Sequence, residues 1–225
     1  MNWLIKTLTS SVGQKILMSL TGFFLISFLM VHLTGNLMLF KNDGGAAFNA
    51  YAHFMSTAEI IRVAEIILVL GFLLHIFTAW LLTRQNQQTR PQHYAYSRPE
   101  TNSTWASRNM GIAGSIVLIF LVIHLYNFWF QYKFQADIPL APGTDYKDMY
   151  WLVQKVFLEE WWFSMLYIVA MVFLGFHLAH GFESAFQTLG LHHKKYTPFI
   201  KKLGVLFAIA VPAGFISMPI YFLVF

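Results

Sequence analysis

Histidines in the middle of long apolar runs are the residues of this sequence whose chemistry most needs an explanation. The segment GFHLAHGFESAF carries His177 and His180, and His32, His75 and His124 lie in three other apolar runs. Titratable side chains are costly inside hydrocarbon unless protein groups or a ligand hold them. The pattern therefore predicts a buried binding site built from imidazoles.

The elements that position these histidines are predicted to be membrane-spanning helices. The 225 residues are 57% hydrophobic and only 11% charged, whereas soluble domains carry about 25% charged residues. Five apolar runs are long enough for a span, which needs about 20 helical residues. We expect helices at 14–40, 59–83, 108–133, 160–187 and 199–224. The expected fold is an all-α integral membrane protein, a single domain over 1–225.

The distribution of charge predicts how the helices cross the membrane. The connection 84–107 holds three arginines and one acid, and the linker HHKKYTPFIKK is also basic, while loops 41–58 and 134–159 hold most of the acids. The positive-inside rule places the N-terminus in the cytoplasm and the C-terminus outside. Segment 45–56 is expected to form a short interfacial helix on the outer face. We expect contact with membrane lipid and no nucleic-acid partner.

The depths of the buried histidines sort them into two pairs. At about 1.5 Å per helical residue from the cytoplasmic end of each span, His32 and His124 lie roughly 25 Å deep, and His75 and His177 roughly 15 Å deep. Each pair draws on two different predicted helices, and the fifth helix carries no histidine. The pattern predicts two centres stacked across the membrane.

Two imidazoles without a carboxylate or thiolate favour haem iron over zinc. Zinc takes three or four protein ligands, and the chain has no cysteine. Haem iron takes its equatorial ligands from the porphyrin and needs two axial groups from the protein. Two histidines at one depth therefore fit a six-coordinate haem b, an electron-transfer centre with no position left for oxygen or substrate. The alternative for such histidines is a buried hydrogen-bonding network or a proton path.

Four stretches of the sequence form a recognisable set: SSVGQKILMSLTGFFL followed by VHLTGNL, AAFNAYAHFM, STWASRNMG, and GFHLAHGFESAFQTLGLHHKKYTP. They resemble the di-haem cytochrome b anchor of succinate:quinone oxidoreductases, the single-chain, five-helix type, over nearly the whole chain. The resemblance implies a succinate dehydrogenase or fumarate reductase complex in the inner membrane, with an iron–sulfur subunit and a flavoprotein subunit on the cytoplasmic side. It also implies two haem b groups and quinone, commonly menaquinone, as the membrane partner.

The same resemblance distinguishes the two histidines of the opening segment. In that family the ligand on the fourth helix stands in a Phe-His-x-x-x-Gly context, which here is Phe176, His177 and Gly181. His180 is then expected to be a neighbour that hydrogen-bonds a haem propionate or a water. Some members carry a glutamate two positions before the ligand, where this chain has Gly175. The expected metal ligands are His32, His75, His124 and His177.

A cluster of polar residues beyond the deeper pair is the expected quinone site. Quinone chemistry moves two protons with two electrons, so it needs titratable and hydrogen-bonding groups at the membrane edge. We expect Glu65 or His53 to handle protons, together with Arg62, and the headgroup to be bound with the help of Asn36 and Tyr51. Two alternatives stay open: an i,i+3 ion pair between Arg62 and Glu65 that only supports the helix, and a quinone site on the cytoplasmic side.

Other functions would use the same residues differently. A haem-free transporter or channel could use the buried histidines as a proton relay, but paired repeats and interrupted helices, typical of transporters, are not obvious here. A transmembrane ferric reductase would carry two ligands on each of two helices. The cytoplasmic arginines in and next to the 84–107 connection are expected at the iron–sulfur subunit, or alternatively at lipid phosphates; they are Arg84, Arg90, Arg98 and Arg108.

Overall fold

The computed structural model describes residues 3–88, 104–159 and 161–225, and in this part of the chain nearly all regular structure is helical. Five apolar helical segments are long enough to cross a membrane, so the chain is a multi-pass membrane protein. Their bounds are Ser11–Phe40, Glu59–Gln88, Met110–Phe134, Trp161–Thr188 and Thr197–Val224. The predicted all-α fold with five spans is confirmed, and each predicted span agrees with the observed one to within a few residues.

The spans are built from the following elements, in chain order. The first span is α2 (Ser11–Asn36) with the 3₁₀ turn η1 (Leu37–Phe40), and the second is α4 (Glu59–Gln88). The third consists of α6 (Met110–His124), a π-helical segment η3 (Leu125–Phe130) and α7 (Gln131–Phe134). The fourth and fifth spans are α9 (Trp161–Thr188) and α10 (Thr197–Val224). Short helices α1 (Trp3–Thr9), α3 (Ala46–Thr57), α5 (Trp105–Arg108) and α8 (Met149–Glu159) lie at the ends of the bundle.

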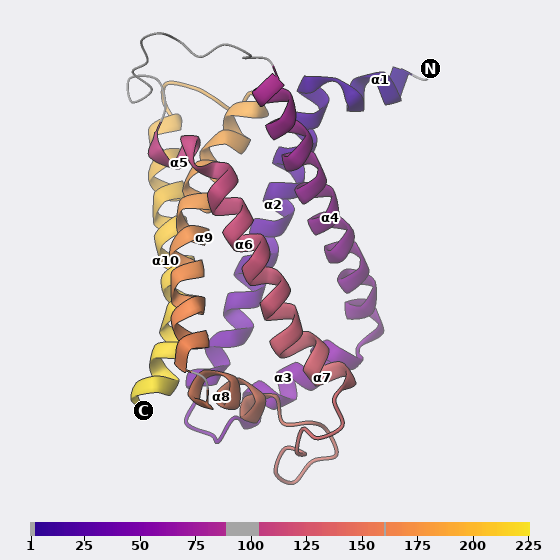
Figure 1. Ribbon diagram of the computed structural model, residues 1–225, viewed down its shortest axis with the longest axis vertical. Coiled ribbons are helices and arrows are strands. Elements are labelled where there is room, and N and C mark those ends of the chain that lie inside the picture. Colours follow the sequence, from indigo (N-terminus) through magenta and orange to yellow (C-terminus); the bar gives the residue numbers. More distant parts are fainter. Residues whose placement is uncertain (1–2, 89–103, 160) are drawn as a thin grey trace.

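Helix α9 organises the bundle because it packs against α2, α6 and α10, while α4 packs along α2. The two chain ends lie at opposite ends of the bundle, as an odd number of spans requires (Figure 1). Helices α3 and α8 lie at the same end as the C-terminus, and α1 and α5 lie at the other (Figure 1). Helix α4 presents apolar side chains to the surrounding lipid, among them Ile60, Val63, Ile66, Ile67, Val69, Leu70 and Leu73.

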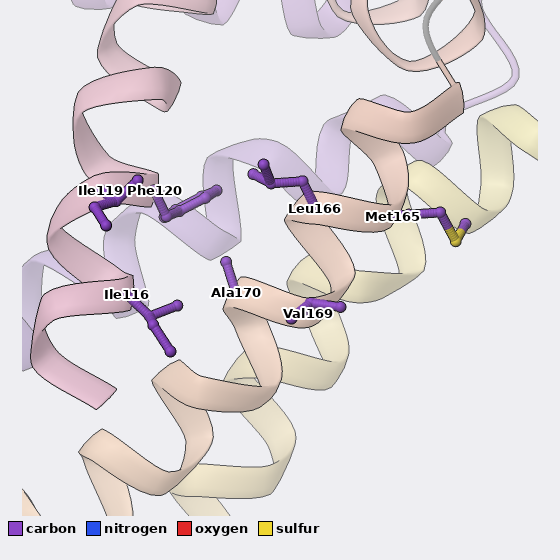
Figure 2. A pocket seen from close by; sticks show the side chains of 7 residues that line it. All are labelled: Ile116, Ile119, Phe120, Met165, Leu166, Val169 and Ala170. Carbon is purple, nitrogen blue, oxygen red and sulfur yellow. The ribbon is translucent and has the colours of Figure 1, made fainter. Parts of the chain in front are cut away.

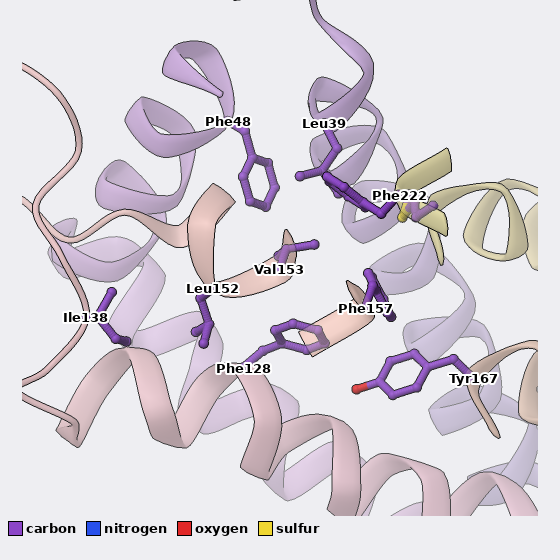
Figure 3. Close-up of a cluster of buried hydrophobic side chains, with 10 residues drawn as sticks. Leu39, Phe48, Phe128, Ile138, Leu152, Val153, Phe157, Tyr167 and Phe222 are labelled. Carbon is purple, nitrogen blue, oxygen red and sulfur yellow. The ribbon is translucent and has the colours of Figure 1, made fainter. Parts of the chain in front are cut away.

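The end of the bundle with α3 and α8 has its own apolar core. Buried side chains of η1, α3, η3, α8, α9 and α10 meet there (Figure 3); they include Leu39, Phe48, Phe128, Leu152, Phe157, Tyr167 and Phe222. Asn49, only 1% exposed, donates from Nδ2 to Asp148 Oδ1 at 2.8 Å, and its own Oδ1 accepts from the Tyr150 amide at 2.8 Å. Asp148 Oδ1 also accepts from the Trp151 amide at 2.8 Å, as an N-cap does. This network joins α3 to the start of α8.

The predicted interfacial helix at 45–56 is observed as α3, but α8 was predicted to be part of a loop. Some lysines lie on the acid-rich side and weaken the positive-inside pattern. They have local partners there. Lys147 Nζ donates to the carbonyl oxygens of Tyr132 and Gln135 at 2.8 and 2.7 Å, at the C-terminus of α7. Lys155 lies over the Trp151 ring. These cations stabilise the fold at this end of the bundle.

Candidate functional site

Four half-buried histidines from four different spans meet as two pairs. His75 of α4 and His177 of α9 have ring centroids 6.3 Å apart, and we name them the α4–α9 pair. His32 of α2 and His124 of α6 have ring centroids 5.8 Å apart and form the α2–α6 pair. Because α2 and α6 start at the end of the bundle that carries α1, their histidines lie far along each helix, at a different level from the other pair.

The spacing within each pair fits a single metal ion between the two rings. Two metal–imidazole bonds of about 2 Å each place the ring centroids roughly 6 Å apart on opposite sides of the ion. Both observed separations, 6.3 and 5.8 Å, are close to that value. Among the described residues no group of three or more His, Asp or Glu side chains comes together. A centre that takes two protein ligands therefore fits this arrangement better than a site built from protein groups alone.

The surroundings of His75 orient its ring toward His177. The hydroxyl of Thr21 donates to the carbonyl oxygen of Leu17 at 2.9 Å, so its oxygen is free to accept from His75 Nδ1 at 3.0 Å. With the Thr21 hydrogen on the backbone carbonyl, this contact favours the tautomer that has the proton on Nδ1 and a lone pair on Nε2, which is the tautomer that a ligating histidine needs. His75 thus has a side-chain partner at Nδ1.

Two glycines allow the α4–α9 pair to lie close to neighbouring backbones. A Cβ atom on Gly22 would lie 3.8 Å from Cε1 of His75, and one on Gly114 would lie 3.5 Å from Cε1 of His177. Larger side chains at either position would press on the imidazole. Nδ1 of His177 is buried and has no hydrogen-bond partner.

Aromatic rings enclose the α2–α6 pair. Phe28 stacks on His32 with centroids 5.2 Å apart, and Phe120 and Phe128 lie 5.4 and 5.2 Å from His124. Asn36, one turn after His32, donates from Nδ2 to the His32 carbonyl oxygen at 2.8 Å and lies 3.5 Å from His32 Nδ1. Asn36 is therefore where the sequence placed it, beside the deeper pair.

His180 occupies a different position from His177. It is half-buried on α9 and has no ring contact with another histidine in the described part of the chain, while Glu183 follows it at i+3. The geometry therefore pairs His177, and not His180, with His75. This agrees with the choice made from the Phe-His-x-x-x-Gly context.

Glu65 lies on the side of α4 that faces the end of the third span. Its carboxylate accepts from Nζ of Lys133 at 3.1 Å and also from the indole N–H of Trp129. Arg62 instead pairs with Glu59 at 3.2 Å, in an exposed i,i+3 ion pair. The alternative pair between Arg62 and Glu65 is therefore not formed among the described residues. Glu65 is held across two helices, with 31% of its side chain exposed.

The other members of the predicted quinone cluster lie apart from Glu65. Tyr51 packs on α2 so closely that a Cβ atom on Gly35 would overlap its ring, and burial raises the pKa of the Tyr51 hydroxyl. His53 stacks on Tyr146 with centroids 4.5 Å apart. In the described residues neither side chain shares a hydrogen bond, ion pair or ring contact with Glu65. The predicted cluster thus divides into separate groups.

Sequence reasoning missed Thr21, Trp129 and Lys133. Trp129 and Lys133 stand at i and i+4, and Lys133 is a cation on the acid-rich side, which was the available sign that a carboxylate partner exists. Thr21 carries no distinguishing pattern, because a threonine within a span usually bonds only its own helix. Of the arginines expected at a partner subunit, Arg84 lies over the Trp80 ring at 4.8 Å; Arg90 and Arg98 lie outside the described residues.

An apolar pocket of about 350 Å³ lies beside the α2–α6 pair, between α6 and α9 (Figure 2). Phe120, which packs on His124, forms part of its wall. The other lining residues are Ile116, Ile119, Met165, Leu166, Val169 and Ala170. Such a wall suits hydrocarbon and offers no polar side chain.

Comparison of the chain with protein-family models, with curated proteins and with solved structures finds no match.

Proposed function

We propose that this chain is the membrane anchor and electron-transfer subunit of a succinate dehydrogenase or fumarate reductase complex. The observation that carries the proposal is the meeting of four histidines, one from each of four spans, in two pairs spaced for a metal ion. The sequence motifs that resemble the di-haem anchors support the same function. The quinone half of the reaction then belongs to this chain, and the dicarboxylate chemistry to another subunit.

Two haem b groups are the proposed cofactors, one held by His75 and His177 and the other by His32 and His124. When bound, such a haem would supply one-electron transfer. The protein's part is to present a ring nitrogen of each histidine and to fix the ring's orientation. Thr21 contributes to this at His75 through its contact with Nδ1.

Glu65 is the proposed proton-handling residue at the quinone site. Quinone reduction takes up two protons with two electrons, and quinol oxidation releases them, so a carboxylate at the membrane edge suits both directions. Lys133 and Trp129 hold this carboxylate, and the Lys133 ammonium is a donor from which a quinone carbonyl oxygen can accept. His53, Tyr51 and Asn36 line the same end of the bundle and are proposed to contribute to headgroup binding. Arg62 is turned to Glu59 and has a smaller part.

The proposed setting is the inner membrane with the α1 end in the cytoplasm. The positive-inside rule supports this orientation, because the basic 188–198 linker lies at that end and the sequence of the 84–107 connection is also basic. The iron–sulfur subunit, with the flavoprotein subunit behind it, would bind there, nearer to the α4–α9 pair. Electrons would then pass between that partner and a quinone, with menaquinone as the first candidate, at the far end.

A haem determination tests the proposal directly. The full-length chain, purified from membranes with its partners, is expected to contain two haem b per chain by pyridine haemochrome assay. Its reduced-minus-oxidised spectrum is expected to show two low-spin components. His192→Ala changes an exposed loop histidine and is the matched control, which should keep both haems. A fully assembled preparation without haem would overturn the proposal and favour the proton-relay transporter.

A further inference from the structure

The third span changes its helical form directly after His124. Residues Leu125–Phe130 form a π-helix, in which each hydrogen bond closes over five residues instead of four. The side chains that follow are rotated relative to an uninterrupted α-helix. π-helical turns are rare and concentrate at functional sites. A functional role is therefore expected for the side chains of this segment, which directly follows the proposed metal ligand His124.

The π-helical segment turns a polar side chain into the interior of the bundle. Asn127 is only 4% exposed. The hydroxyl of Tyr167 from α9, a residue 6% exposed, lies beside it and the two side chains interact, but among the described residues neither Asn127 Nδ2 nor the Tyr167 oxygen completes a well-formed hydrogen bond. Nδ1 of His124 is also buried without a hydrogen-bond partner in this part of the chain, and its ring centroid lies 6.1 Å from that of Tyr167. Three polar groups from two helices thus share one buried region.

The rest of this region is aromatic and cannot accept these hydrogen bonds. Phe120, Phe128 and Phe157 pack around Tyr167 with centroid distances of 4.9, 6.0 and 5.2 Å. Figure 3 shows the Tyr167 hydroxyl pointing toward Phe128, inside the apolar core. Buried polar groups in native proteins are nearly always satisfied by protein or by ordered water. The three groups therefore require a hydrogen-bond acceptor.

The chemistry of the three groups selects the acceptor. When Nε2 of a histidine binds a metal ion, Nδ1 carries the proton and donates it, almost always to a carboxylate, a carbonyl or a water. Asn127 Nδ2 is also a donor, and a tyrosine hydroxyl can donate or accept. A water molecule can accept from two donors and donate to a third group, and buried waters typically make about three such bonds.

We infer that His124, Asn127 and Tyr167 enclose an internal water that accepts the Nδ1 hydrogen of His124. Asn127 and Tyr167 are then positioning residues of the α2–α6 centre, acting on the ligand through the water. This inference rests on the proposed function for its haem but concerns side chains to which that function assigns no role. The water takes the part that the Thr21 hydroxyl plays directly at His75.

The test measures the two haem potentials in the purified full-length complex. Tyr167→Phe keeps the ring and its packing but removes the hydroxyl, and Asn127→Leu removes the amide at similar volume. Either change weakens the acceptor for the His124 Nδ1 hydrogen, so the ligand donates less charge and the reduced state is favoured. We expect the reduced-to-oxidised ratio of one haem, at fixed potential, to rise three- to tenfold; tenfold is about 59 mV for a one-electron couple. The other haem should not change.

Two controls make the result specific. Tyr126→Phe removes a hydroxyl from an exposed tyrosine of the same π-helical segment, so both potentials should stay as in the unchanged protein. In the unchanged protein, exchange into D₂O should add deuterons near the haem of the α2–α6 pair, detectable by pulsed electron paramagnetic resonance. This second measurement needs no variant and holds even if Asn127→Leu fails to fold.

The outcomes separate the inference from the proposed function. Absence of haem overturns the function. Two haems whose potentials are unmoved by Tyr167→Phe and Asn127→Leu overturn the inference alone. An experimental structure that places a haem propionate, instead of a water, between Asn127 and Tyr167 also overturns it.

Discussion

The two histidine pairs have the same ligand types but different surroundings. At the α4–α9 pair a hydroxyl oxygen contacts His75 directly, and glycine backbones lie against both rings. At the α2–α6 pair phenylalanine rings pack on the imidazoles, and the polar groups nearby are amides and a buried tyrosine. Under the proposed function both centres have two histidine ligands, so a difference between haems held there would come from these neighbours. The comparison therefore concerns the neighbours of each pair and not the histidines themselves.

Removal of a histidine ligand should have the largest effect, the loss of one haem. His75→Ala should remove the haem of the α4–α9 pair, and His124→Ala that of the α2–α6 pair, each leaving one haem with a distinct spectrum. Haem per chain should fall from two to one by haemochrome assay. His177→Ala should behave as His75→Ala, while His180→Ala should keep both haems. Retention of both haems in His177→Ala with loss of one in His180→Ala would show that the ligand choice is wrong.

A glycine substitution should affect one pair without touching a ligand. Gly114→Leu places a side chain against the His177 ring, from which even a Cβ atom would be only 3.5 Å away. We expect at least half of the haem of the α4–α9 pair to be lost, with the other haem unchanged. Gly111→Leu is the matched control on the same helix, because nothing lies within 4 Å of a Cβ atom there. Equal behaviour of the two variants would contradict the proposed packing.

Glu65→Gln tests whether the quinone binds at the end of the bundle nearer the α2–α6 pair. The amide keeps the shape but cannot take up a proton, so quinone turnover should fall at least tenfold while both haem spectra survive. Glu59→Gln removes an exposed carboxylate from the same helix and should have little effect.

The competing placement of the quinone makes the opposite prediction. Unimpaired turnover in the double variant Glu65→Gln, His53→Ala, with quinone protecting residues at the α1 end from labelling, would place the site on the cytoplasmic side.

Thr21→Val should produce the smallest of these effects, a change in the haem of the α4–α9 pair alone. It removes the acceptor for the His75 Nδ1 hydrogen at nearly constant volume. The reduced-to-oxidised ratio of the haem of the α4–α9 pair should rise about threefold at fixed potential, since the ligand donates less charge. Thr34→Val on the same helix removes an exposed hydroxyl that bonds only its own backbone and should leave both potentials unchanged. A redox titration that shows equal shifts in both variants would disprove this role.

Much of the architecture could be predicted because hydrocarbon imposes it. A span must satisfy its own backbone hydrogen bonds, so apolar length alone identifies a helix. The unpredicted α8 is an amphipathic helix of only 11 residues, too short for a span, so this rule does not identify it. Its sign in the sequence was Asp148, whose carboxylate accepts from the Trp151 amide at the start of the helix. The π-helical segment left no comparable sign, because it differs from an α-helix only in where its hydrogen bonds close.

The sequence by itself determined the five spans, the presence of histidine in four of them and the sorting of these histidines by depth, since a regular rise per residue converts position into height. Only the tertiary structure decided that the rings of each pair lie close together, that Thr21 reaches His75, and that Asn127 and Tyr167 share one buried region. It also decided that Glu65 pairs with Lys133, which lies 68 positions away, instead of with Arg62. The physical reason is that depth along a helix is a local property, whereas the partner across a helix interface depends on how whole helices rotate and pack against one another.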